Sequence, residues 1–263
     1  MILNKKVFFL MGVTASGKTD FAFKLSRNYP FEIISVDSVM MYKFFNIGSG
    51  KFYNDLLFYK PHYFIDFLFP NVVYTMSDFC IESVNIIINV LSRKKYPLFV
   101  GGSMMYFLFL EKGFSFLSNS NSFVKNKLLY IVHENNLLYL YEKLINLKCY
   151  KLLIYKVKDK YRLLKLIEIL ILTGSFLNNF KNLDNFYILK NFDILKISLF
   201  FNKIFLFKKI ENRIYEMLKN GFIEEVMDLF CNVNLNKAFP SLRSIGYKQV
   251  FFLWGNRIKL IQD

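Results

Sequence analysis

A glycine-rich stretch near the start of the chain has the residue types and spacing of a phosphate-binding loop. Gly12, Gly17, Lys18 and Thr19 match the pattern G-x-x-x-x-G-K-[ST] without a gap. The glycines let successive backbone N–H groups point at a phosphate, the following helix adds its positive end, and the lysine adds a cation. The threonine hydroxyl can hold Mg²⁺. The sequence therefore predicts a bound diphosphate or triphosphate. The loop residues between the two glycines are Val13, Thr14, Ala15 and Ser16.

Asp37 is the second candidate for chemistry, because it directly follows a short buried strand expected at residues 33–36. Ligands of open α/β sheets bind at the carboxyl ends of the strands, so Asp37 should face the phosphate loop. There it could act as a general base or as a carboxylate that orients a metal. The alternative is a turn or helix-capping residue, for which aspartate is equally suited. We favour the functional interpretation because this strand is the second in a phosphate-loop sheet.

A third polar group is expected at the same edge of the sheet. Residues 96–102 form an apolar run that ends in two glycines and is followed by Ser103. A strand that ends there would bring backbone N–H groups and the Ser103 hydroxyl into the site. An ordinary strand-to-helix turn explains these residues equally well. The loop at residues 40–51, with Gly48 and Gly50, is expected to line the substrate entrance.

Strands and helices alternate in the first part of the chain and resume near its end. This alternation predicts an α/β fold with a parallel sheet of the P-loop NTPase type, flanked by helices. The last helix carries Lys209 and Arg213 one turn apart on the same side. The expected strands are 7–11, 33–36, 61–66, 96–102 and 191–199, and the expected helices are 18–28, 75–91 (capped by Thr75 or Ser77) and 204–221.

The alternation stops near Gly113, and residues 119–172 have helical spacing with many lysines. We therefore expect a core of residues 1–113 and 190–263 with a mainly helical insertion at 114–189. The insertion's basic residues could hold RNA or form a solvated face.

Basic and aromatic residues also interleave near the end of the chain, where Arg243, Tyr247 and Lys248 surround Gly246. This pattern suits RNA backbone contact and base stacking, or an ordinary helix end.

The formal net charge of +15 favours a polyanionic partner, with RNA or DNA ahead of a membrane surface. Codon bias toward lysine is the alternative, since only 6 of the 35 cationic residues are arginine. No apolar run is long enough to span a membrane, and the first strand leaves no room for a signal peptide. The three cysteines are widely spaced and fit a reducing compartment. We expect a cytoplasmic monomer without membrane association.

Several stretches jointly resemble one family, the tRNA dimethylallyltransferases, also called tRNA isopentenyltransferases. They are distributed from one end of the chain to the other, whereas a generic phosphate-loop protein would share only the first. The matching stretches are GVTASGKT (12–19), ISVDSVMMY (34–42), IGSGK (47–51), PHYFID (61–66), VVYTMSDF (72–79), PLFVGGSMMYF (97–107), YRLLKLIEILILTG (161–174) and PSLRSIGYKQ (240–249).

The resemblance implies transfer of a dimethylallyl group from dimethylallyl diphosphate to N6 of the adenosine next to the anticodon on its 3′ side. The phosphate loop would hold the diphosphate with Mg²⁺, and Asp37 would accept the N6 proton. Ser103, where threonine is usual, would bond near that amine. The base would be extruded from the anticodon loop of the tRNA. The residues implied to grip the tRNA are Asp37, Ser38, Val39, Met40, Ser103, Lys125, Tyr161, Arg162, Lys165, Arg243, Gly246, Tyr247 and Lys248.

The chain departs from the family pattern in a few places. Val13 replaces the usual proline, and Lys209, implied to bind the diphosphate, replaces a typical arginine with a point charge. Members of the family usually continue beyond the position of Asp263 with a basic segment that helps to hold the tRNA.

The competing function is a P-loop nucleotide or small-molecule kinase. Such kinases commonly use arginines in a lid, and this chain has few arginines.

Overall fold

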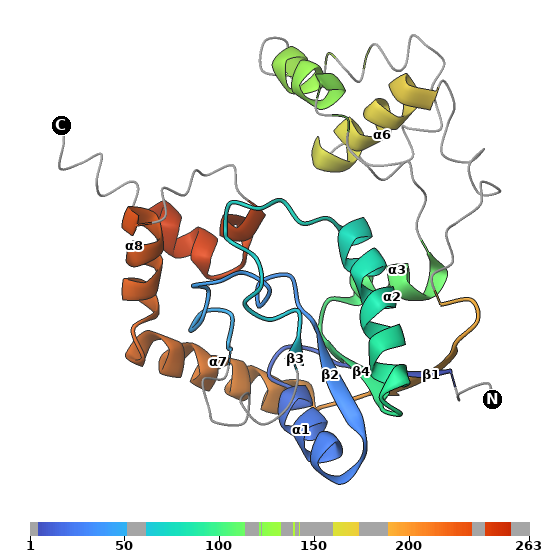
Figure 1. Cartoon of the computed structure of the whole chain (residues 1–263). Coiled ribbons are helices and arrows are strands. Elements are labelled where there is room, and N and C mark those ends of the chain that lie inside the picture. Colours follow the sequence, from blue (N-terminus) through green and yellow to red (C-terminus); the bar gives the residue numbers. More distant parts are fainter. Residues whose placement is uncertain are drawn as a thin grey trace. The chain divides into compact units, whose positions relative to one another are not determined.

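The structure is a computed structural model that describes residues 5–51, 62–113, 121, 123–132, 139, 142, 160–173, 189–232 and 240–253. The chain divides into two compact units (Figure 1). Unit 1 comprises Met1–Glu111 and Ile188–Asp263, and unit 2 comprises Lys112–Tyr187. Most of the insertion expected at 114–189 lies outside the described residues. The expected domain boundaries therefore remain a prediction.

Unit 1 is built on a five-stranded parallel sheet with the strand order β3-β2-β4-β1-β5. Met11 at the end of β1 pairs with Gly101 and Ser198, and Val36 at the end of β2 pairs with Gly101. The carboxyl ends of four strands therefore meet at one edge, and the predicted α/β class is confirmed. The strands are β1 (Lys6–Met11), β2 (Phe31–Val36), β3 (His62–Tyr63), β4 (Tyr96–Gly101) and β5 (Asp193–Ser198).

Helices cover both faces of this sheet (Figure 1). On one face, α1 (Lys18–Asn28) buries Ala22 and Phe23 in a cluster with Leu10 and Ile33. On the other face, Phe107 of α3 (Met104–Lys112) packs against Phe9, with 5.0 Å between ring centroids. Because helices cover both faces of the central strands β1, β2 and β4, these strands are mostly buried and mostly apolar. The edge strand β5 is more exposed, with Leu195 40% exposed.

The helix α2 (Met76–Ser92) begins with a capping box at Thr75. The Thr75 hydroxyl accepts a hydrogen bond from the Asp78 N–H at 3.2 Å, and the Asp78 carboxylate accepts one from the Thr75 N–H at 2.8 Å. Two N–H groups that the first turn would leave unpaired are satisfied in this way. The cap is therefore Thr75 and not Ser77.

The C-terminal part of unit 1 is helical. The helix α7 (Lys203–Lys219) is capped by Asn202, whose side chain accepts a hydrogen bond from the Ile204 N–H. A turn at Gly221 leads into α8 (Phe222–Asn232). Later described elements are the 3₁₀ helix η4 (Pro240–Arg243) and a helical segment at 247–253. No α7 side chain is fully buried, and Arg213 is among those that are partly buried.

In unit 2, the described part consists mainly of α6 (Lys160–Thr173) and a helical segment at 123–132. Leu163 and Ile167 of α6 are buried, as are Leu128 and Val132. The Glu168 carboxylate accepts a hydrogen bond from the Asn121 N–H, which ties the two helical segments together. Across the described residues of both units, no helix has the length and apolar character needed to cross a membrane.

Candidate active site

The phosphate loop connects β1 to α1 at the carboxyl edge of the sheet. Gly17 caps α1 with a φ of 72°, a left-handed conformation that glycine adopts without strain. No side chain caps this helix end. Its first N–H groups and the positive end of its dipole are therefore available to an anion. Residues 14–20 line one wall of a cavity at this end of the helix.

Lys18 is folded onto the loop that it follows. Its Nζ donates to the Val13 carbonyl at 2.5 Å and to Ser16 Oγ at 3.3 Å. The pKa of Lys18 is lowered to about 8, mainly because the ammonium is buried. The nearby Arg213 also lowers this pKa, and Asp37 opposes both effects. A bound diphosphate would favour the protonated form and raise this pKa.

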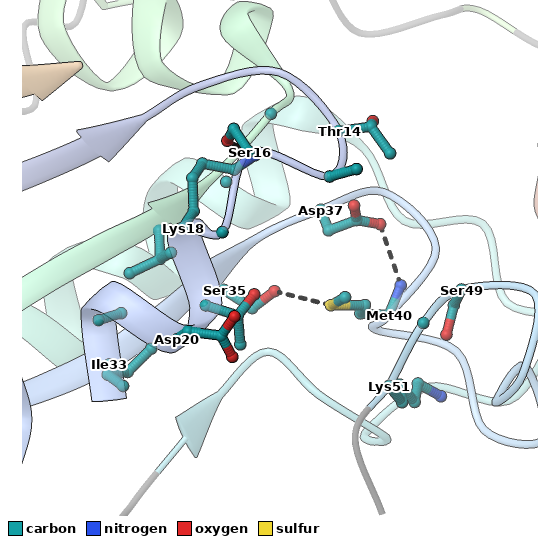
Figure 2. A pocket seen from close by; sticks show the side chains of 18 of the residues that line it. Thr14, Ser16, Lys18, Asp20, Ile33, Ser35, Asp37, Met40, Ser49 and Lys51 are labelled. Carbon is teal, nitrogen blue, oxygen red and sulfur yellow. Dashed lines mark hydrogen bonds between the residues drawn. The ribbon is translucent and has the colours of Figure 1, made fainter. Parts of the chain in front are cut away.

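Asp37 directly follows β2 and lines the same cavity. Its Oδ1 accepts hydrogen bonds from the N–H groups of Val39 at 2.8 Å and Met40 at 3.2 Å, as in an Asx turn. Figure 2 shows the bond from Met40. Within the described part of the chain, no group donates to Oδ2. The turn role and an open carboxylate oxygen therefore coexist in one side chain.

Arg213 is a cavity residue that the sequence analysis placed beside Lys209 on one helix but did not assign to the site. It lies on α7 one turn after Lys209, and both residues line the cavity. The Arg213 Nη2 donates to the Ser49 carbonyl at 3.3 Å. Burial lowers its pKa below the ordinary value, and Asp37 opposes the change. The spacing of Lys209 and Arg213 is visible in the sequence, but only the position of α7 brings them to the phosphate loop.

Lys51 is the second residue that the sequence did not assign to the site. Its side chain is only 2% exposed, and its Nζ donates to the Tyr42 carbonyl and pairs with Asp66. Burial lowers the pKa of Lys51, while Asp66, Glu225 and Asp37 raise it. Its signal in the sequence was the IGSGK stretch, which carries no chemistry by itself.

These groups surround one cavity of about 420 Å³ in unit 1. Figure 2 shows Asp37 and Met40 between the phosphate loop on one side and Ser49 and Lys51 on the other. The cavity has a cationic and N–H-rich end and an apolar wall, so it suits a small molecule with an anionic head and a hydrocarbon part. The apolar wall includes Ala22, Phe23, Ile33, Ile65 and Val100.

Ser103 lies at the start of α3, where its carbonyl accepts a hydrogen bond from the Tyr106 N–H at 3.0 Å. The preceding Gly101 and Gly102 are among the described residues that line the cavity, and Ser103 is not. Gly12 and Val13 belong to the loop but are also absent from this lining, and Val13 is exposed.

The residues expected to grip tRNA fall into several groups. Met40 lines the cavity beside Asp37, and Ser38 is exposed next to it. Lys248 in unit 1 and Lys125 in unit 2 are also exposed. Val39 is partly buried, and Gly246 has a φ of 90°. Lys165 is paired with Glu168 at 3.1 Å within α6. The side chains of Tyr161, Arg162 and Arg243 lie outside the described residues.

The structure corrects the prediction that the Tyr247 ring is available to stack on RNA. The side chain is completely buried, and its hydroxyl donates to Glu225 Oε1 at 2.6 Å. Its ring packs against Phe45 and Phe222, with centroid distances of 4.6 and 5.1 Å. A ring enclosed in this way is not available to a base. The alternating basic and aromatic residues near Gly246 predicted an exposed aromatic ring, but Tyr247 is part of the hydrophobic core.

The loop, its helix and the parallel sheet define an α/β protein of the P-loop class. Comparison with protein families narrows this class. The model of the IPP transferase family matches residues 40–262, and the model of isopentenyl transferases matches residues 5–66.

Curated relatives agree with these family models. The chain is 36% identical to the tRNA dimethylallyltransferase of Legionella pneumophila (strain Paris) over 249 residues, which are 94% of this chain and 79% of that protein. It is also 36% identical to the enzyme of the same name from Coxiella burnetii (strain RSA 331), covering 95% of this chain and 81% of the relative.

Solved structures show the same relationship. The tRNA isopentenylpyrophosphate transferase of Staphylococcus epidermidis aligns with a TM-score of 0.63 at 26% identity, covering 95% of this chain and 81% of that one. A eukaryotic dimethylallyltransferase acting on tRNA aligns with a TM-score of 0.77 at 26% identity, covering 98% of this chain and 65% of that one. The chain belongs to the IPP transferase family of tRNA dimethylallyltransferases, as the sequence motifs predicted.

Proposed function

We propose that the chain transfers a dimethylallyl group from dimethylallyl diphosphate to N6 of the tRNA adenosine on the 3′ side of the anticodon. One observation carries this proposal: a single cavity combines an uncapped phosphate loop, an apolar wall and the open oxygen of Asp37. A diphosphate with a short hydrocarbon chain matches both ends of the cavity. The names of the relatives support the same reaction.

In this reaction the bond between the allylic carbon and the diphosphate oxygen breaks, and its electron pair leaves with the diphosphate. The loop N–H groups and Lys18 stabilise the developing negative charge. Arg213 and Lys209 approach the same cavity from α7. Arg213 can donate two parallel hydrogen bonds, whereas Lys209 supplies a point charge.

The lone pair of the adenine N6 forms the new carbon–nitrogen bond, and the nitrogen then loses a proton. Asp37 Oδ2 is the proposed acceptor, because Oδ1 is held in place by the Val39 and Met40 N–H groups. The turn therefore orients the base without using the oxygen that does the chemistry. Ser103 is proposed to bond near the amine, on the basis of the family resemblance alone.

Mg²⁺ is the proposed cofactor, which the Thr19 hydroxyl would hold together with the bound diphosphate. Thr19 lines the cavity directly after Lys18, and a hydroxyl oxygen is a suitable hard ligand. Among the described residues, no cluster of three or more His, Cys, Asp or Glu side chains could hold a metal. A site completed by the substrate agrees with this finding. When bound, the ion supplies charge neutralisation to the leaving group.

The proposed macromolecular partner is the anticodon stem-loop of a tRNA. The net charge of +15 supports a polyanionic partner, and the exposed Ser38 and Lys248 are available to it. The other predicted contacts remain proposals: Val39, Met40, Ser103, Lys125, Tyr161, Arg162, Lys165, Arg243 and Gly246. The cytoplasmic location, the monomeric state and the assignment of residues 114–189 to tRNA binding also remain predictions.

Purified protein with dimethylallyl diphosphate, Mg²⁺ and an A-rich anticodon stem-loop tests this function. We expect mass spectrometry of the digested RNA to show one prenylated adenosine. The matched control is the same stem-loop with guanosine at the target position, which should stay unmodified. Unmodified adenosine together with ATP turnover would instead favour the kinase function.

A further inference from the structure

Glu225 on α8 binds a row of backbone N–H groups in the loop that leads to the active site. Its Oε2 accepts from the N–H groups of Asn46 at 3.0 Å and Ile47 at 2.7 Å, and its Oε1 accepts from Gly48 at 3.2 Å. Three successive N–H groups that converge on one anion form a small anion-binding nest. In this protein, the nest is occupied by a carboxylate of the chain itself.

Tyr247 completes this arrangement from another part of the chain. Its hydroxyl donates to Glu225 Oε1 at 2.6 Å, so the carboxylate accepts four hydrogen bonds in total. The loop also lies directly against the aromatic rings beside it. A Cβ added to Gly48 would come within 2.1 Å of Phe222 and 2.6 Å of Tyr247. The loop is therefore held by hydrogen bonds and by close packing at the same place.

The three residues that follow the Glu225-bound segment 46–48 all line the cavity. Ser49, Gly50 and Lys51 come directly after it. The Ser49 carbonyl accepts a hydrogen bond from the Arg213 guanidinium, which is in turn attracted by Asp37. Displacement of the loop would remove the acceptor that orients Arg213 and would move the buried Lys51. A shift of about 1 Å in such groups can cost about 100-fold in rate.

We infer that Glu225, assisted by Tyr247, is a positioning residue that fixes the loop at residues 46–51 and thereby orients Arg213 toward the diphosphate. This role rests on the proposed transfer reaction. Glutamine at position 225 would have only one acceptor oxygen, and its amide NH₂ would face backbone donors. The charge and both oxygens are therefore required. No local sequence pattern indicates this role, because Glu225 and the loop N–H groups that it binds are separated by more than 170 residues.

The test compares Glu225→Gln and Tyr247→Phe with Glu224→Gln, an exposed carboxylate on the same helix. We expect kcat per folded molecule to fall about 10- to 100-fold in Glu225→Gln and about 3- to 10-fold in Tyr247→Phe, with RNA affinity unchanged. Glu224→Gln should stay within about twofold of the wild type. An equal loss in Glu224→Gln would overturn the proposal. Tyr247→Phe removes only a hydroxyl and preserves the test if Glu225→Gln does not fold.

A double-mutant cycle with Arg213→Gln separates positioning from a general loss of stability. If Glu225 acts through Arg213, Glu225→Gln should change kcat by less than about threefold in the Arg213→Gln background. Losses that multiply in the double variant would show independent effects and overturn the proposal.

Two measurements remain valid without any transfer activity. Hydrogen exchange of a peptide spanning residues 42–51 should be faster in Glu225→Gln, while peptides from α1 should not change. The affinity for inorganic pyrophosphate with Mg²⁺ should fall about tenfold. A wild type that fails to prenylate RNA would refute the proposed function, and these two measurements would then decide the role of Glu225. Unchanged exchange or unchanged pyrophosphate affinity would overturn that role.

Discussion

Strand β2 carries one carboxylate near its start, Glu32, and another just after its end, Asp37. The Glu32 side chain is 1% exposed and accepts hydrogen bonds from Arg93, Lys95 and Tyr63. Burial alone would raise its pKa, but these donors hold it at about 2. Asp37 uses only Oδ1, for its turn, and its side chain lines the cavity.

The difference shows how a parallel sheet separates structural from functional carboxylates. At the amino end of the strand, every lone-pair direction of Glu32 is used, so this group holds its charge and takes no part in proton transfer. At the carboxyl end, where such sheets bind ligands, Asp37 keeps an oxygen for the substrate. Lys18, Lys51 and Arg213 interact with Asp37 electrostatically.

The largest expected effect comes from Asp37→Asn. Asparagine keeps Oδ1 for the Val39 and Met40 N–H groups but cannot accept a proton at neutral pH. We expect kcat to fall about 10²- to 10⁴-fold, as measured by single-turnover prenylation. The free energy of unfolding should change by no more than about 0.5 kcal/mol. Asp228→Asn, an exposed position on α8, is the matched control, and comparable activity of the two variants would remove Asp37 from the mechanism.

Glu32→Gln should lower stability and leave activity unchanged, which is the opposite of the result expected for Asp37→Asn. Removing one partner of a buried ion pair typically costs about 3–5 kcal/mol. We expect the free energy of unfolding to fall by about 2–3 kcal/mol, at or below the lower end of that range. The loss is smaller because Arg93 and Lys95 are 45% and 41% exposed and can turn to water. Denaturant unfolding measures the loss, and kcat per folded molecule should match the wild type. A large loss of kcat in the folded variant would break the distinction between the two carboxylates.

The pH dependence of kcat/KM for dimethylallyl diphosphate should report the cations around Asp37. Because the pKa of Lys18 is lowered to about 8, its ammonium is charged below that pH and neutral above it. We expect kcat/KM to fall about tenfold per pH unit above about pH 8. In Lys18→Arg this fall should move to higher pH, since arginine stays protonated. A fall that stays at pH 8 in this variant would assign the titration to another group.

The smallest expected effect is the acid dependence of stability. The pKa of Glu32 is about 2 in the folded protein and 4.5 as the ordinary value. Because the folded-state value is lower, its contribution is complete above about pH 4.5 and is lost as the pH falls through 2. The difference in unfolding free energy between wild type and Glu32→Gln should narrow over that window. A constant difference down to pH 2 would show that charge is not its origin.

Local patterns in the sequence predicted most of the fold. The expected helix at 18–28 corresponds to α1, and the strand expected at 191–199 contains β5. These elements have strong local signals: a glycine loop, continuous apolar runs and helical spacing. The strand expected at 61–66 is only two residues long, His62–Tyr63. Phe64 and Asp66 have φ values of 62° and 54°, which do not continue a strand.

The candidate site could be predicted only where one stretch of sequence contains all the residues of a motif. The phosphate loop and Asp37 follow directly from their strands. Arg213, Lys51 and Glu225 act through contacts with distant segments, and no local pattern encodes such contacts. Tyr247 shows the converse error, because a motif that suits RNA binding also fits a core position.

The position of β1 in the sheet has a consequence for synthesis of the chain on the ribosome. One edge of β1 pairs with β4, which ends at residue 101. The other edge pairs with β5 and stays unpaired until residues 193–198 have been synthesised. At about 5–20 residues per second, translation from β1 to β5 takes about 10–40 s. During that time the nascent chain exposes the unpaired edge of an apolar strand, a template for aggregation. A chain that stopped before β5 would therefore lose solubility as well as the arginine of α7.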